Sequence, residues 1–285
     1  MILPYFFLTI SLSISLVKKK ERIVVCLVGV INRSIKDTWF SIKNNIINEL
    51  KKKYIVDIAL FNNNVGNCLV DGVKLNNRNL RQIPYNYLFE FLQTNIDKKI
   101  SKIKDFNKEF PPYWKTRFKL NGIRQMYMES IVAEFLKKST YKIALVSNPD
   151  HLYINKFDCE QEIMSDHVTT CAHLDMNGFT NGFYYGHTNN IIKILNRIND
   201  YDKLIQINTN KINYEQILKR SFQMNKIKRF TTDLFFIKIR ANREIQIFGM
   251  DYIKESNTTK KIYLEYLNKN KDKHPIYKYL LSIYK

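Results

Sequence analysis

Apolar and polar positions follow one another along the chain in blocks that predict an α/β protein. Residues 23–31 (IVVCLVGVI) form an unbroken apolar run, which is typical of a parallel strand covered on both faces. Apolar residues then recur at helical spacing from Ile35 to Leu50, and three lysines follow, where cations suit the end of a helix. Residues 54–61 (YIVDIALF) predict a second strand. Together the three segments predict a βαβ unit with a right-handed crossover.

The middle of the chain has the same order of helix and strand. A mostly apolar face at helical spacing predicts a helix over 120–138, which leads into a strand at 141–147. Pro149 cannot donate to a sheet ladder, so we expect the strand to end before it and to place Asp150 beyond its carboxyl end. Ligands of open α/β sheets bind at such strand ends. Asp150 is therefore a candidate site residue, although aspartate is also a common turn residue.

Shorter patterns predict the remaining elements. These are a short helix at 85–92, an aromatic strand at 183–185 between glycines, a helix capped by Thr188, a helix at 214–222, and a strand at 234–240 that pairs with 245–248. Residues 62–79, rich in Asn and Gly, and the polar residues 158–179 are predicted to be loops. Without an internal repeat or a long linker, the sequence predicts one domain over 21–250, preceded by an apolar segment at 1–20 and followed by a basic helical tail at 251–285.

The N-terminal segment leaves two alternatives open. Residues 2–17 are uncharged and mostly apolar, and three lysines follow them. This run is shorter than the roughly 20 residues that span a bilayer, and it contains Pro4. No basic segment precedes it, so a cleaved secretory signal is a poor fit. The segment is either a membrane anchor, whose lysines would keep the protein on the cytoplasmic side, or an additional packed element.

Charge and composition bear on the partners. The 285 residues are 45% hydrophobic, which is enough for a large core, and 46 Lys and Arg against 26 Asp and Glu give a net charge of +20. Such a charge favours polyanions, among them nucleic acids, anionic membranes and phosphorylated small molecules. The lysines are dispersed and no nucleic-acid-binding motif accompanies them, so we do not expect nucleic acid as a partner. A basic polyanion-binding protein remains the alternative.

The four cysteines are too few for a disulfide scaffold in a chain of this length. Cys26 lies in the first predicted strand and is most simply a small buried apolar residue. Cys159, His167, Cys171 and His173 form a C-x7-H-x3-C-x-H pattern, which matches no common zinc site. A polar active-site loop is the simpler interpretation of that segment.

Four motifs, taken in order, resemble a known family. They are Gly29 and Arg33 at the end of the first strand, Arg124-Gln125 in the predicted helix, Asn148-Pro149-Asp150, and residues 178–186 (GFTNGFYYG). This succession resembles a group of glycosyltransferase-like proteins from large DNA viruses and algae, which look like nucleotide-sugar-dependent transferases of GT-A fold. The resemblance covers roughly residues 23–242, and its motifs are short.

The resemblance implies a GT-A-like (Rossmann-like) α/β fold: a mixed, mainly parallel sheet flanked by helices, in a single domain with C-terminal helices. It implies transfer of a sugar from a nucleotide-diphosphate sugar to a glycan, protein or lipid acceptor. A Mn²⁺ or Mg²⁺ ion would be held by Asp150 against the donor diphosphate. A cytoplasmic or membrane-associated location and a viral origin would accompany this function.

Roles for single residues follow from the same resemblance. The donor would contact Gly29, Arg33, Arg124, Asn148, Asp150 and Asn181. Asp150 and Asp175 would be the catalytic residues, with Asp175 as the base if the reaction inverts the sugar. Tyr184 and Tyr185 face opposite ways if they lie in a strand, so one of them would stack on the acceptor and the other would lie in the core.

Two departures from the family's pattern bear on activity. The family usually has Arg-Pro-Asp where this chain has Asn148-Pro149-Asp150, so a cation beside the donor phosphates is missing. The family's Asn-Asp before the aromatic strand is Thr180-Asn181 here, which removes a carboxylate. A catalytically degenerate, transferase-like scaffold is therefore a second alternative.

Overall fold

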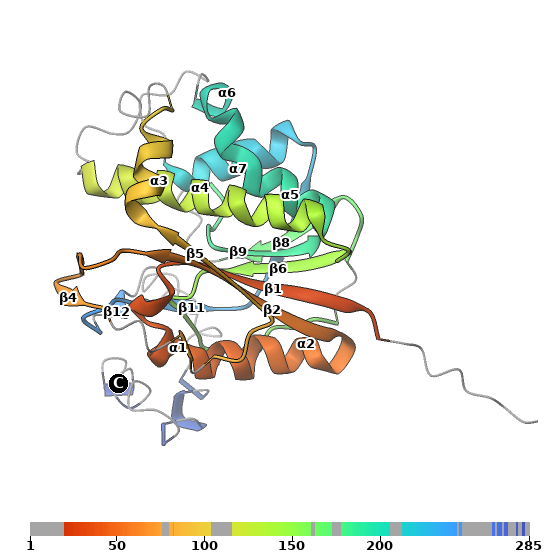
Figure 1. Cartoon of the computed structure of the whole chain (residues 1–285). Coiled ribbons are helices and arrows are strands. Elements are labelled where there is room, and N and C mark those ends of the chain that lie inside the picture. Colours follow the sequence, from red (N-terminus) through yellow and green to blue (C-terminus); the bar gives the residue numbers. More distant parts are fainter. Residues whose placement is uncertain are drawn as a thin grey trace, which may run out of the picture.

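The computed structural model describes residues 20–75, 80–81, 83–103, 116–160, 163–172, 178–205, 213–243 and 245–246, with short pieces between 264 and 282. In this part of the chain a seven-stranded sheet lies between two layers of helices (Figure 1). The strand order is β10-β8-β9-β6-β1-β2-β5.

The centre of the sheet is built from the apolar runs that the sequence shows. β1 (Arg22–Gly29) pairs in parallel with β2 (Ile55–Asn64) on one side and with β6 (Ile143–Ser147) on the other. β5 (Tyr87–Leu92) adds to β2 in parallel. Four of the six pairings in this sheet are parallel, and β9 supplies the two antiparallel ones. The remaining strands are β8 (His167–Cys171), β9 (Phe183–His187) and β10 (Lys228–Thr232).

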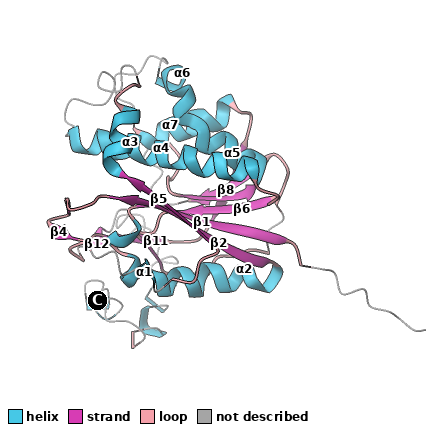
Figure 2. Ribbon diagram, viewed as in Figure 1, coloured by secondary structure: helices cyan, strands magenta, loops and turns pink. Residues whose placement is uncertain are grey.

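Helices cover both faces of the sheet (Figures 1 and 2). One face carries α1 (Ile35–Ile42), a π-helical stretch (Lys43–Ile47) and α2 (Asn48–Lys53). The other face carries α3 (Gln93–Ile100), α4 (Thr116–Lys138), α5 (Thr188–Leu195), α6 (Tyr201–Ile205) and α7 (Tyr214–Met224). Two short 3₁₀ segments, Ile31–Arg33 and Asn196–Asp200, connect elements.

The alternation of side chains along β1 divides the core in two. Val24, Cys26 and Val28 belong to the apolar cluster under α4 and α5, and the intervening residues Ile23, Val25 and Leu27 belong to the cluster under α1 and α2. All six side chains are buried. The described residues confirm the predicted fold class of a mixed, mainly parallel sheet flanked by helices in one domain.

A second, smaller sheet lies beyond the end of β6. After Pro149 the chain resumes as β7 (His151–Tyr153), which pairs antiparallel with β11 (Phe236–Ile239), and β12 (Ile245–Gln246) extends this sheet. The predicted pairing of the strand at 234–240 with residues 245–248 is confirmed for residues 245 and 246.

Several predicted elements were wrong. Residues 85–92 were predicted to be a helix, but 87–92 form β5, because aromatic side chains pack well on the pleated edge beside β2. Residues 167–171, within a predicted loop, form β8. The loop predicted at 62–79 contains the end of β2 and a hairpin of β3 (Leu69–Val70) and β4 (Val73–Lys74). Thr188 is the first residue of α5, and His187 holds the capping position.

The two terminal predictions fall mostly outside this description. Of the segment at 1–20 the structure describes residue 20 alone, and of the tail at 251–285 it describes short pieces, so both stay predictions. Across the ranges that are described, no helix has both the length and the apolar character that a membrane crossing requires.

Candidate functional site

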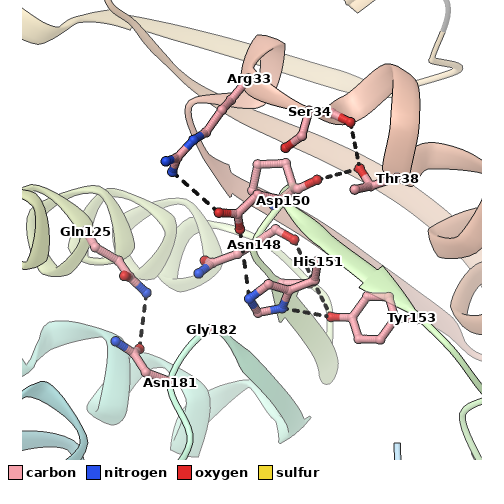
Figure 3. Close-up of polar contacts among 12 residues, drawn as sticks. Arg33, Ser34, Thr38, Gln125, Asn148, Asp150, His151, Tyr153, Asn181 and Gly182 are labelled. Atoms are coloured by element: carbon pink, nitrogen blue, oxygen red, sulfur yellow. Dashed lines mark hydrogen bonds and ion pairs between the residues drawn. The ribbon is translucent and has the colours of Figure 1, made fainter. Parts of the chain in front are cut away.

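The candidate site lies at the carboxyl ends of β1 and β6. The chain leaves β1 for the helices on one face of the sheet, and it enters β6 from α4 on the opposite face. The strand order changes direction between β1 and β6, because β2 follows β1 on one side and β6 pairs with β1 on the other. Ligands of open α/β sheets usually bind at such a point. The structure brings Arg33, Asn148 and Asp150 to this place (Figure 3). Gly29 lies there as well, against Pro149.

The loop after β6 is held by its neighbours on three sides. Gly29 has φ +136°, and a Cβ atom built on it would lie 3.5 Å from Cδ of Pro149, so the two strand ends touch. The Thr38 hydroxyl donates to the carbonyl oxygen of Pro149 over 2.6 Å. The Asn148 N–H donates to the carbonyl of Gly182 over 3.0 Å. These contacts fix the position from which Asp150 projects.

The Asp150 carboxylate lies among basic side chains. Its Oδ2 lies 3.5 Å from Nη1 of Arg33, and its Oδ1 lies 3.9 Å from Nε2 of His151 (Figure 3). Oδ2 also lies 3.7 Å from Nη1 of Arg240. Lys238 pairs with His151 across the β7–β11 ladder and also acts on this carboxylate. Burial alone would raise the pKa of Asp150, but these four groups hold it below its usual value.

Arg33 is shared between two carboxylates. Its Nε and Nη2 atoms donate to Asp71 over 2.8 and 3.0 Å, in the two-point geometry that suits guanidinium and carboxylate. Asp71 lies in the β3–β4 turn with φ 51°, and Gly72 follows with φ 77°, as expected for an Asp-Gly hairpin turn. Asp71 also accepts from the Ala241 N–H over 3.0 Å. The hairpin is thereby tied to the end of β11.

These contacts test whether Asp150 fits the predicted Mn²⁺ or Mg²⁺ ion. A divalent ion needs oxygen ligands and a negative local charge, and sites of this kind commonly combine carboxylates. Oδ2 of Asp150 faces the guanidinium groups of Arg33 and Arg240, its Oδ1 lies near the His151 ring, and the oxygens of Asp71 are used by Arg33 and Ala241. In the described ranges, no three His, Cys, Asp or Glu side chains are grouped to hold a metal. The donor set therefore fits an anion better than a divalent cation.

Asn181, another predicted donor contact, belongs to a second polar group beside the site. The Asn181 side-chain oxygen accepts from Tyr184, Gln125 and Arg197, over 2.6, 3.1 and 3.4 Å. Arg124, the neighbour of Gln125, makes a two-point contact with Asp97 of α3 over 2.7 and 2.6 Å. The structure thus brings Gln125 rather than Arg124 to Asn181 (Figure 3).

Other predicted residues fall outside the site or outside the description. Asp175 and His173 lie among the residues that the structure does not describe, so the proposed base stays a prediction. Tyr184 and Tyr185 belong to opposite core clusters and both are buried, so the expectation that one of them stacks on an acceptor finds no support. The Cys159 thiol donates to the carbonyl of Glu49 over 3.3 Å, as a core side chain does.

Three charged residues around Asp150 were not predicted to belong to the site. Lys238 and Arg240 were placed in a strand at 234–240, and Asp71 was placed in a loop. The Asp71-Gly72 pair was a hairpin signal, and the carboxyl end of the predicted strand at Arg240 pointed to the same kind of position as Asp150. What the sequence lacked was the antiparallel pairing of β11 with β7, which places Lys238 opposite His151.

Comparison with known proteins finds matches among solved structures. No family profile and no curated protein sequence matches the chain. Among solved structures, the apo crystal structure of mouse xyloside xylosyltransferase 1 is similar at a TM-score of 0.43 and 5% sequence identity. The match covers 75% of this chain and 85% of that chain. The fold assignment above rests on the strand order of this chain.

Proposed function

We propose that this protein binds a nucleotide-diphosphate sugar at the carboxyl ends of β1 and β6 and transfers the sugar to an acceptor hydroxyl group. One observation carries the proposal. Three segments on which the family resemblance rests lie far apart in sequence, yet they meet at the point where ligands of α/β sheets bind. Gly29 abuts Pro149, Arg33 reaches Asp150, and Asn148 donates its N–H to Gly182.

The charge of the site supports a phosphate-bearing donor. In the transfer, the acceptor oxygen forms a bond to the anomeric carbon of the sugar as the bond from that carbon to the phosphate oxygen breaks. The nucleoside diphosphate leaves with the electron pair, and the hydroxyl proton passes to a base, the role proposed for Asp175. The leaving group gains negative charge, so cationic side chains that face it stabilise the transition state. Arg33 provides a planar fork of donors that suits a phosphate.

A thermal-shift screen of UDP- and GDP-sugars tests the proposal. A ligand present at about 100 times its Kd stabilises the folded state by about 2.7 kcal/mol, which is a rise in Tm of about 5–10 °C for a chain of this size. We expect such a rise with at least one nucleotide sugar and not with uridine or guanosine, which lack phosphates. Release of the nucleoside diphosphate from the bound donor then measures turnover.

Two variants with matched chemistry localise the binding. Arg33→Met removes a cation at the carboxyl end of β1 and should abolish most of the shift. Arg22→Met removes a cation at the amino end of the same strand, where Arg22 pairs with Asp57 over 2.9 Å, and should retain the shift. If no nucleotide sugar raises the Tm of the wild-type protein, the proposed function is wrong, and the degenerate scaffold becomes the better interpretation.

A further inference from the structure

A group of five charged side chains, here called the Asp150 cluster, lies where the donor phosphates would bind. It comprises Arg33, Lys238 and Arg240 with the carboxylates of Asp71 and Asp150. The cations come from two separate places in the fold, the loop after β1 and the end of β11. Glu215 also acts on Lys238. Around Asp150 itself, however, positive groups predominate.

The cluster is partly exposed to solvent. The side chains of Arg33 and Arg240 are 20% and 18% exposed, and those of Asp71 and Asp150 are 22% and 12% exposed. Ion pairs at the surface contribute little to stability, and completely buried pairs carry a large desolvation cost. The groups of the cluster lie between these two cases, beyond the carboxyl ends of β1 and β6.

The carboxylates of Asp71 and Asp150 occupy the positions at which the cations of the cluster would neutralise the anionic oxygens of a ligand. Asp71 occupies the donor fork of Arg33 with two short hydrogen bonds, a geometry that phosphate oxygens also adopt. Asp150 Oδ2 lies between Arg33 and Arg240 at 3.5 and 3.7 Å, which is longer than an ordinary charge-assisted hydrogen bond. Burial lowers the pKa of Lys238, the carboxylate of Asp150 raises it, and the neighbouring Arg240 lowers it, so an added anion there relieves repulsion between cations.

We propose that Arg33, Lys238 and Arg240 neutralise the donor diphosphate without a divalent metal ion, and that Asp150 serves as their counter-ion. This inference rests on the proposed function and concerns how the same site holds its substrate. The cations do for the leaving phosphates what a metal ion does in other transferases. Asp150 orients Arg33 and Arg240 and keeps them in place when the site holds no ligand.

Calorimetric titration with UDP and GDP separates this proposal from metal binding, because the two make opposite predictions for Asp150→Asn. A site of cations loses a competing carboxylate in this variant, so we expect the Kd measured in EDTA to stay equal or to fall by up to about 10-fold. A metal site loses its ligand, so binding would require Mn²⁺ in the wild type and would disappear in the variant.

Variants of the cationic residues are titrated in the same buffer with EDTA. We expect Arg240→Met and Lys238→Met each to raise the Kd by roughly 10-fold or more, the effect of losing one charge-assisted contact. Arg22→Met, at the other end of β1, should leave the Kd unchanged. Circular dichroism confirms that each variant is folded, and two separate cation variants keep the test valid if one of them fails to fold.

The outcomes distinguish this inference from the proposed function. Binding in EDTA that weakens in each cation variant that folds and persists in Asp150→Asn supports the inference. Binding that requires Mn²⁺ and is lost in Asp150→Asn overturns it and leaves the glycosyltransferase proposal in place. Absence of binding to any nucleotide or nucleotide sugar, with or without Mn²⁺, overturns both.

Discussion

The ion pair between Glu129 and Arg197 gives the sharpest test of what holds the core beside the site together. Glu129 of α4 is 0% exposed and Arg197 is 1% exposed, so the pair lies wholly within the protein. The other carboxylate oxygen of Glu129 accepts from Gln125 over 2.9 Å. Arg197 also donates to the carbonyl of Ile194 over 3.3 Å and to Asn181 over 3.4 Å. Both of these contacts are long, so the partner that matters is Glu129.

Arg197→Met removes the cation and leaves the carboxylate of Glu129 buried. Breaking a buried pair from one side costs about 3–5 kcal/mol, because a charge remains in an apolar medium without compensation. Gln125 still donates to this carboxylate, so we expect a loss near the lower end, about 3 kcal/mol. Typical domains have an unfolding free energy of about 5–15 kcal/mol, so the loss is a large share of the total.

Urea denaturation followed by circular dichroism measures this loss as a lower midpoint at constant slope. The double variant Glu129→Gln with Arg197→Met removes both charges and should recover most of the lost stability. Lys137→Met breaks the exposed pair with Glu134 on the same helix and should change the free energy of unfolding by less than about 1 kcal/mol. A loss below about 1 kcal/mol in Arg197→Met would refute the idea that Glu129 is charged and dependent on Arg197.

Three further predictions test the fold and the site. Gly122→Ala should lower the Tm, because the added Cβ would lie 1.7 Å from the ring of Tyr214. Alanine is ordinarily the better helix residue by about 1 kcal/mol, so a raised Tm would contradict this packing. In the native protein a thiol reagent should modify Cys68 rapidly, and in urea it should modify the three buried thiols as well, which are Cys26, Cys159 and Cys171. The pKa of Asp150 in the folded state lies below its ordinary value of 3.8, so the unfolded state binds the proton more readily. The wild type should therefore lose stability relative to Asp150→Asn as the pH falls below about 4. Parallel profiles of stability against pH would contradict this.

The sequence predicted the centre of the sheet well, because its strands are buried on both faces. β1, β2 and β6 are continuous apolar runs, and such runs have few structural alternatives. The edges were harder to predict. β5 is half-exposed and carries aromatic residues, so its pattern fits a short helix as well as a strand, and its pairing with β2 decides the outcome. β8 has a polar sequence, and its position between β9 and β10 makes it a strand.

About half of the candidate site could be predicted from the sequence, because those residues follow strands that the apolar runs define. Residues just after parallel strands can be located from strand ends, which identified Arg33 and Asp150. Asp71 reaches the site on a hairpin turn that is hydrogen-bonded to Ala241. Lys238 and Arg240 reach it through the antiparallel ladder of β7 and β11, whose strands lie more than 80 residues apart along the chain. Local pattern contains no information about which strand pairs with which, so these contacts required the structure.

The charges around Asp150 give one explanation for both departures from the pattern of the family that the sequence resembles. At the first, the family that the sequence resembles has an arginine where this chain has Asn148, so a cation is missing beside the proposed donor phosphates. Arg240 and Lys238 bring positive charge to the same strand end from β11, so the charge has another source. At the second, a carboxylate is replaced by Asn181, whose side-chain oxygen accepts three hydrogen bonds from protein donors. A carboxylate suits a metal ion, and a site that holds phosphate with arginine and lysine does not require one at this position. Under the proposed function, a gain of cations and a loss of a carboxylate change the site in one direction, toward direct binding of the diphosphate.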